Sequence, residues 1–193
     1  RVDALVEVLD QRIRARGVEL SDRLAALRDV AADDQGLALA VAGLRERAAW
    51  PEEFAATSRR LAGLDLLVLL GGDDAPLAAA ASDPAWADDL AGGRGGDLRR
   101  ALLRADDNLG LLALNDALAL VRLDSLHLAG ETLTLIGGRA VNEAVLAELS
   151  GGDVALSLVY HGGALSTDAD LRERLEPGGR ARVSSPEYLI PRD

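Results

Sequence analysis

The sequence predicts an α+β protein in which a helical segment comes first and a mostly antiparallel sheet follows. Two observations support this fold class. Apolar residues recur at helical spacing through residues 1–63, whereas short apolar runs separated by Gly and Asp turns begin at residue 64. We therefore expect an N-terminal helical region, residues 1–63, with one long and two short helices, and a sheet domain, residues 64–193.

One long helix is expected over residues 1–32. Val6, Ile13, Leu20 and Leu27 recur at intervals of seven, and charged residues fill most of the other positions. Such a helix is about 45 Å long, which is more than a small domain needs to cover it. Two interpretations are open: the apolar stripe packs on the helix's own domain, or it pairs with a second copy of the chain.

Two short helices are expected next. The first is marked by Leu37, Val41 and Leu44. The second begins near Pro51, because proline suits the first turn of a helix, and it ends at Gly63.

A hairpin and a long loop should follow these helices. Residues 64–70 are apolar except for Asp65 and end in a Gly-Gly-Asp-Asp turn, and the run 77–81 is apolar again, which predicts two strands. Residues 82–108 are rich in Gly and Asp. They predict a mobile loop with a short helix near residues 97–103.

The strand signals are densest between residues 111 and 136. A short strand over 111–114 precedes a long strand over 117–128, and an Ala-Gly turn leads to a return strand over 131–136. Gly137 and Gly138 are expected to end this hairpin.

One helix interrupts the strands of the last third. Asn142 predicts an N-cap for a helix over 143–149, and Gly151 predicts its end. The remaining expected elements are a strand over 154–160, a short helix over 168–176 and an extended segment over 182–190.

The composition excludes several classes of protein. The chain has 193 residues, a net charge of −11 and no cysteine, so it has neither a thiolate nucleophile nor a Cys-ligated metal. An acidic chain without a basic block is not a nucleic-acid binder. No apolar run approaches the roughly 18 residues of a membrane span, and no signal peptide is visible. We interpret the sequence as a segment of a longer protein.

Four pieces of the sequence together resemble a known family. They are the long leading helix, residues 63–70, the hairpin from Leu118 to Gly138, and residues 153–160 followed by two glycines. Within the hairpin, residues 134–139 before the capped helix are the closest piece. The order of the pieces is similar to that in the extracytoplasmic PAS-like or Cache-like sensor domains of bacterial membrane-bound sensor histidine kinases.

This resemblance implies a role in signal transduction within a two-component system. Such a domain is the periplasmic part of an inner-membrane receptor, between two membrane helices that lie outside this segment. A small molecule or a periplasmic partner binds it and shifts the long helix, and the shift reaches a cytoplasmic kinase core. The full-length receptor is expected to be a homodimer, and the segment itself to be no enzyme and to hold no cofactor. The alternative is a soluble dimeric interaction protein without a small-molecule ligand.

Arg122 and Asp124 are the first candidates for ligand binding. Strand alternation places them on the same side as Leu118, Leu120 and Leu126, so a regular strand would point two charges at the apolar face. Buried charges need partners or a ligand. Arg122 could hold an anion bidentately in a pocket on this face. A bulge that turns both residues outward and a mutual ion pair are the other interpretations.

Two aromatic residues complete the candidate set. Trp86 lies in the predicted loop, where it either contacts a ligand or packs on the domain's own core. Tyr160 shares its strand face with Leu156 and Leu158, which favours a half-buried core residue over a ligand contact. The two histidines, His127 and His161, have no metal-ligand spacing, so no metal site is expected.

Overall fold

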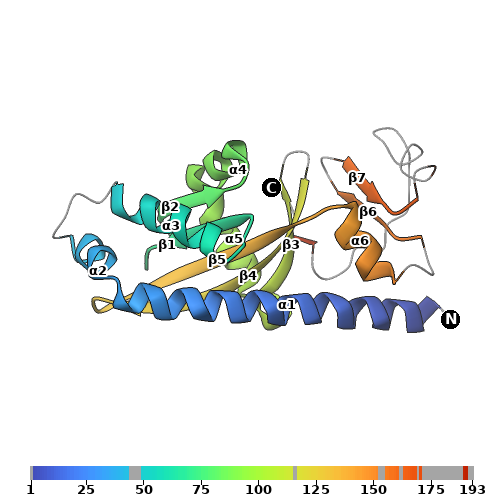
Figure 1. Ribbon diagram of the computed structural model, residues 1–193, viewed down its shortest axis with the longest axis horizontal. Coiled ribbons are helices and arrows are strands. Elements are labelled where there is room, and N and C mark those ends of the chain that lie inside the picture. Colours follow the sequence, from blue (N-terminus) through green and yellow to red (C-terminus); the bar gives the residue numbers. More distant parts are fainter. Residues whose placement is uncertain are drawn as a thin grey trace.

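A six-stranded sheet with helices on both faces organises the chain in the computed structural model (Figure 1). The structure describes residues 2–43, 49–114, 117–151, 155–160, 163–168, 170 and 189–190. The strand order is β2-β1-β5-β4-β3-β8, and neighbouring strands are antiparallel except for the parallel pair β3–β8. The strands of this sheet are β1 (Leu66–Leu70), β2 (Pro76–Ala81), β3 (Leu109–Leu114), β4 (Ala117–Leu128), β5 (Glu131–Val141) and β8 (Leu189–Ile190). The α+β fold class with a leading long helix is confirmed.

Helix α1 (Val2–Asp33) runs along the length of the molecule on one face of the sheet (Figure 1). Its apolar stripe is buried from Ile13 to Ala31, with Leu20, Leu24 and Leu27 at most 5% exposed. Val6 is 60% exposed. The stripe therefore packs on its own domain over most of its length, which is the first of the two interpretations left open by the sequence.

Two glycines allow α1 to lie close to the sheet. A Cβ at Gly17 would come within 2.6 Å of the Leu109 side chain on β3, and a Cβ at Gly137 would come within 2.7 Å of Leu24 on α1. Gly17 sits inside a helix and Gly137 inside a strand, where glycine is otherwise unfavourable. Close packing between α1 and the sheet explains both.

Strand β5 is longer than expected. It continues through Gly137 and Gly138 to Val141, so the prediction that these glycines end the hairpin is wrong. Both glycines are paired on two sides, with β4 and with β1. These ladders outweigh the low strand propensity of glycine. The pairing of β4 with β5 runs without a break in register from Leu118 to Leu128.

Two further helices lie on the same face as α1. They are α2 (Gln35–Val41) and α3 (Ala49–Leu61), as expected from the sequence. Leu37 of α2 and Phe54 of α3 belong to the hydrophobic cluster that also contains Leu67 and Leu135 of the sheet. The core of this face is thus shared across the expected boundary at residue 63.

The opposite face is covered by helices where the sequence predicted a loop. Residues 84–102 form α4 (Pro84–Asp89), a π-turn (Leu90–Arg94) and α5 (Gly95–Leu102), so the loop prediction is wrong over this range, although the helix expected near 97–103 is present. Asp83 caps α4 by accepting a hydrogen bond from the Ala85 N–H, and Pro84 occupies the first turn. This Asp-Pro pair is a helix start signal. A 3-10 turn (Asp106–Asn108) leads into β3.

The sheet separates two apolar clusters, which we call the α1 face and the α5 face. In β1, Leu67 and Leu69 point to the α1 face, and Leu66, Val68 and Leu70 point to the α5 face. All five are completely buried. A strand covered on both sides is apolar throughout, as the sequence of β1 is.

Helix α6 (Glu143–Ser150) has the ends that the sequence predicts. The Asn142 side chain accepts a hydrogen bond from the Val145 N–H, and Gly151 adopts a left-handed conformation with φ of 75°. The strand expected over 154–160 is shorter, since β6 (Ser157–Tyr160) pairs with β7 (Gly163–Ser166). Most of the expected helix over 168–176 and most of the segment 182–190 lie outside the described residues.

Candidate functional site

A cleft opens beside α1, where the end of β5 and helix α6 meet it. One hollow of about 240 Å³ adjoins a second of about 430 Å³, and Arg16, Glu19 and Glu148 line both. We call the two hollows together the α1 cleft. The lining of the first hollow is Arg16, Glu19, Leu20, Arg23, Leu120, Arg139, Ala140, Val141, Val145 and Glu148.

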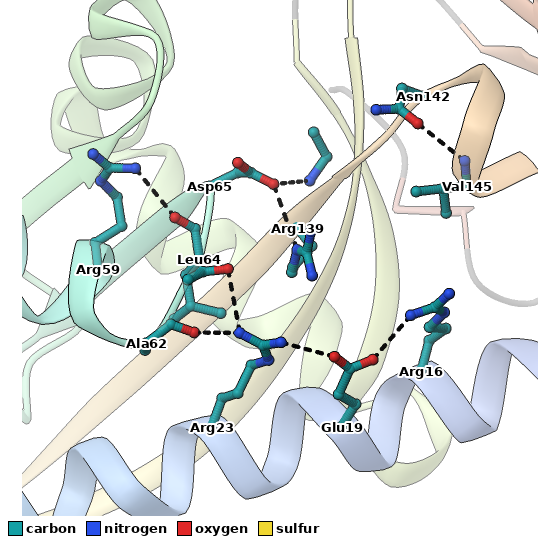
Figure 2. A network of polar contacts seen from close by, with 12 residues as sticks. Arg16, Glu19, Arg23, Arg59, Ala62, Leu64, Asp65, Arg139, Asn142 and Val145 are labelled. Atoms are coloured by element: carbon teal, nitrogen blue, oxygen red, sulfur yellow. Dashed lines mark hydrogen bonds and ion pairs between the residues drawn. The ribbon is translucent and has the colours of Figure 1, made fainter.

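The α1 side of the cleft carries four charged residues beside the buried stripe, which are Arg12, Arg16, Glu19 and Arg23. Glu19 lies between two arginines, 3.0 Å from Arg16 Nη1 and 2.8 Å from Arg23 Nη2 (Figure 2). The hydrogen bond from Arg23, and then that from Arg16, holds the pKa of the Glu19 carboxyl below its ordinary value. Glu19 is therefore a carboxylate held between two guanidinium groups.

The arginines of α1 also bind the ends of neighbouring helices. Arg23 Nη1 donates to the carbonyls of Ala62 and Gly63, which follow α3, and Arg12 Nη1 donates to the Leu149 carbonyl in the last turn of α6 at 2.7 Å. The last carbonyls of a helix lack partners within the helix and attract cations. Charged contacts thus tie α1 to both α3 and α6.

The far wall of the cleft is formed by Arg139 and α6. Arg139 Nε lies 3.8 Å from Asp65 Oδ2, and that same oxygen accepts a 2.8 Å hydrogen bond from the Ala140 N–H (Figure 2). The Arg139 side chain is 46% exposed. On α6, Glu148 forms an ion pair with Arg16. Arg139 is thus held less closely than Arg16 or Arg23.

The structure places Arg122 and Asp124 on the α1 face, as strand alternation predicts. Arg122 Nη1 donates to the Gly17 carbonyl at 3.3 Å, and Asp124 lies 3.4 Å from Arg28. The unbroken register of β4 with β5 leaves no bulge there. Each residue contacts α1, and neither lines the α1 cleft. A ligand-binding role for them stays a prediction.

The two aromatic candidates lie apart from each other and from the α1 cleft. Trp86 is in α4 and is 8% exposed within the cluster of the α5 face, so its expected position in a mobile loop is wrong. Its buried Nε1 has no hydrogen-bond partner in the described part of the chain. Tyr160 on β6 is half-buried against the cluster of the α1 face. Ligand contacts by either residue stay predictions.

The α1 cleft brings guanidinium groups and carboxylates together, so an anion there would compete with Glu19 and Glu148. Its guanidinium groups can each donate paired hydrogen bonds to a carboxylate or phosphate. Among the described residues, no group of three or more His, Asp and Glu side chains could hold a metal ion. His127 is exposed on β4, and His161 lies outside the described residues.

Sequence reasoning missed the residues of this cleft. Arg139 follows Leu133, Leu135 and Gly137 on one side of β5, so continued alternation would have placed it on the α1 face. The expected strand end at residue 136 removed that signal. Arg16, Glu19 and Arg23 flank the buried stripe of α1, where charged residues are ordinary, and nothing in their spacing marks a cleft.

Comparison with known proteins gives structural neighbours only. No protein-family model matches the chain, and no curated protein matches it. Among solved structures, the chain is similar to the periplasmic domain of Vibrio cholerae LuxQ, with 20% identity, a TM-score of 0.44 and coverage of 82% of this chain and 78% of that one. It is also similar to the Campylobacter jejuni chemoreceptor Tlp3, in its ligand-binding domain with L-valine (12% identity, TM-score 0.46) and in its sensory domain with isoleucine (11% identity, TM-score 0.46). Both of these matches cover 88% of this chain and 73% of that one.

Each of these neighbours is a domain of a larger protein. One is described as a periplasmic domain and the others as ligand-binding or sensory domains. No helix in the described part of the chain combines the length and the apolar character that crossing a membrane requires.

Proposed function

We propose that this chain is the extracytoplasmic sensing domain of a two-component sensor histidine kinase, and that it relays binding of a ligand through α1. The observation that carries the proposal is the α1 cleft. The helix of 32 residues is joined to α6 and to the end of α3 by charged contacts that gather around an open hollow. A ligand in that hollow meets the groups that hold the helix in place.

The mechanism is a shift between two positions of α1. A ligand that binds Arg16 or Arg23 competes with Glu19 and Glu148 for the same guanidinium groups. It therefore favours the helix position in which those contacts are changed, and the equilibrium moves toward that position. A helix continuous with a membrane span would carry this movement across the membrane.

A second candidate is a soluble dimeric interaction protein. Val8, Val18 and Val30 on α1 are 42%, 58% and 57% exposed, which gives the helix apolar surface for a second copy. In this case the chain binds no small molecule, and α1 is a dimerisation element alone. Dimerisation also belongs to the sensor proposal, as the state of the full-length receptor.

The flanking sequence in the parent gene separates the two functions. The sensor proposal predicts an apolar stretch of about 20 residues on each side of this segment, followed by a kinase core. Polar flanks with start and stop codons close by would contradict it and would favour the interaction protein. If the flanks are apolar, the sensor proposal also predicts that the full-length receptor in vesicles changes its autophosphorylation rate when a ligand of this domain is added.

A further inference from the structure

The two halves of α1 are attached to the domain in different ways. The C-terminal half, residues 20–33, packs in the core of the α1 face with apolar side chains that are at most 5% exposed: Leu20, Leu24, Leu27 and Ala31. In the N-terminal half, residues 6–19, Ile13 and Gly17 are buried and Leu9 is half-buried, while the other side chains are partly or fully exposed. Because burial of apolar surface is the main stabilising term in folding, the C-terminal half is held more firmly.

Two ion pairs attach the N-terminal half of α1 to other elements. Arg14 Nη1 lies 3.2 Å from Asp107 Oδ2, in the turn before β3, and Arg16 pairs with Glu148 on α6. The four side chains are 39–61% exposed, so water reaches both partners of each pair. This half of the helix is therefore attached by exposed charges where the other half is attached by a buried stripe.

Two charged hydrogen bonds add to these pairs. Arg12 Nη1 donates to the Leu149 carbonyl at 2.7 Å, and Arg122 Nη1 donates to the Gly17 carbonyl at 3.3 Å. A guanidinium group is the donor in both, and the charge strengthens a hydrogen bond of this kind. The two ion pairs and these two hydrogen bonds all depend on the charge of an arginine.

Dissolved salt weakens contacts between exposed charges. The screening length is about 10 Å at 0.1 M salt and falls to about 3 Å at 1 M, which is comparable with the separation of the paired atoms. Each exposed pair is also a weak contact on its own, since water competes for both charges. Raising the salt concentration should therefore loosen the N-terminal half of α1, whereas the buried stripe of the C-terminal half involves no charge to screen.

The rest of the chain should respond to salt in the opposite direction. The net charge of −11 means that carboxylates repel one another across the molecule, and this repulsion opposes the compact state. Salt screens the repulsion and so favours the folded chain. A loosening confined to the N-terminal half of α1 can thus be told apart from a general loss of stability.

We propose that ionic strength controls how firmly the N-terminal half of α1 is held, so that the domain responds to salt in the absence of any ligand. Screening of the pairs at Arg14 and Arg16 frees this half from the turn before β3 and from α6. The inference goes beyond the proposed function, which concerns a bound ligand. In a sensor of that kind, the N-terminal half is the part of α1 that leads toward the membrane.

Hydrogen exchange of the chain at about 50 mM and about 500 mM NaCl tests the proposal. The higher salt should raise exchange in the N-terminal half of α1 about threefold or more, because several weak charged contacts are screened together. Exchange in the C-terminal half should stay the same or fall. Sucrose at the same osmolality should change neither half. An equal rise in both halves, the same response to sucrose, or no response to NaCl would overturn the proposal.

Removing the two arginines should reproduce the effect of high salt. Arg14→Gln combined with Arg16→Gln should raise exchange in the N-terminal half at low salt and abolish most of its response to NaCl. Arg100→Gln combined with Arg104→Gln makes the same charge change elsewhere, since Arg100 pairs with Asp97 of its own helix and Arg104 is exposed after α5. This control should keep the salt response of the parent chain.

The same pairs can be removed without changing α1 itself. Asp107→Asn combined with Glu148→Gln removes the acidic partners, and asparagine suits the left-handed backbone of residue 107, whose φ is 57°. Glu52→Gln combined with Glu53→Gln, at exposed positions of α3, is the matched control. This set serves if the arginine variant unfolds. A full salt response that survives loss of the acidic partners would overturn the proposal.

The salt response and the proposed sensor function can fail separately. If NaCl leaves the N-terminal half of α1 unchanged, this inference is wrong and the relay of ligand binding keeps its own test. If NaCl loosens this half but no ligand moves α1, the salt response is supported and the relay is wrong.

Discussion

The two faces of the sheet are built from similar residues but differ in how their arginines are used. On the α5 face, Arg94 is 16% exposed and binds both Asp89 and the Ala113 carbonyl. On the α1 face, Arg16 and Arg139 are 39% and 46% exposed and line an open cleft. The same side chain therefore fixes a turn on one face and remains within reach of solvent on the other.

Apolar packing also closes the α5 face more completely than the α1 face. Leu90, Leu98 and Leu102 of the helical cover are at most 1% exposed, so the α5 face is closed where these residues lie. The α1 face is closed by the stripe of α1 but opens at its flank, where charged residues replace apolar ones. Stability is thus expected to come from both faces, and binding from the flank of α1.

The largest expected effect is loss of packing on the closed face. Leu98→Ala should lower the free energy of unfolding by about 2–5 kcal/mol, because it removes a buried side chain and leaves a cavity. Denaturant unfolding measures this loss. Ligand binding in the α1 cleft should survive where the variant is folded, and a loss of binding in the folded variant would contradict the separation of the two faces.

Its counterpart on the other face is Leu24→Ala. Leu24 is completely buried between α1 and Gly137 of β5, so the loss of stability should fall in the same range of about 2–5 kcal/mol. Hydrogen exchange should in addition rise in α1 more than in α5. An equal rise of hydrogen exchange in α1 and α5 of this variant would show that Leu24 does not stabilise α1 in particular.

The next effect concerns the enclosed arginine. Arg94→Ala should cost about 1–3 kcal/mol, because the Ala113 carbonyl on buried β3 loses a donor. Arg100→Ala is the matched control, since Arg100 pairs with the exposed Asp97 and should cost at most about 1 kcal/mol. Thermal unfolding compares the two, and equal losses would show that the α5 face is not closed around Arg94.

Arg122→Ala should have a smaller effect on the fold. It removes one hydrogen bond to the Gly17 carbonyl, which is worth about 0.5–1.5 kcal/mol. Calorimetry on this variant separates the two candidate binding surfaces of the α1 face. Unchanged affinity is expected for a ligand that binds in the α1 cleft, whereas lost binding with an intact fold would favour the pocket that the sequence placed at Arg122.

The smallest effect is the pH dependence contributed by Glu19. Its pKa is lowered in the folded chain, so its charged form adds stability above the ordinary glutamate pKa of about 4.3, and this contribution is lost as the pH falls through the lower folded value. Glu19→Gln should therefore be less stable than the parent chain at pH 7, and this difference should shrink as the pH falls below the ordinary glutamate range. A difference that stays constant through this acid range would contradict the ion-pair origin.

Patterns within short stretches of the sequence correctly predicted those helices and strands whose structure depends on residues close together in the chain. The structure has the helix that the seven-residue repeat predicts for α1 and the alternation expected in β4. It also has the expected ends of α6 at Asn142 and Gly151. The side of β4 on which Arg122 lies was also predicted correctly. Each of these features depends on residues close together in the chain.

The failures have a common physical reason. Gly137 and Gly138 act as strand residues because β1 and β4 pair with β5 on both sides. The α1 cleft joins Arg16 and Arg23 to Arg139, more than a hundred positions away in the chain. Neither arrangement leaves a trace in local spacing. The start of α4 is different, because Asp83 and Pro84 are a helix start signal within the sequence itself. The Gly- and Asp-rich composition of residues 82–108 favoured a loop instead.

The distance between α1 and the α5 face tests most directly whether a ligand in the cleft moves α1. The chain has no cysteine, so spin labels at Val18→Cys and Leu103→Cys, both exposed positions, would be unique. Pulsed electron paramagnetic resonance should show a different distance distribution when a ligand saturates the α1 cleft, whereas a control pair at Thr132→Cys and Leu103→Cys should not change. An identical α1 distribution with and without that ligand, when calorimetry shows the cleft to be filled, would contradict a relay through α1.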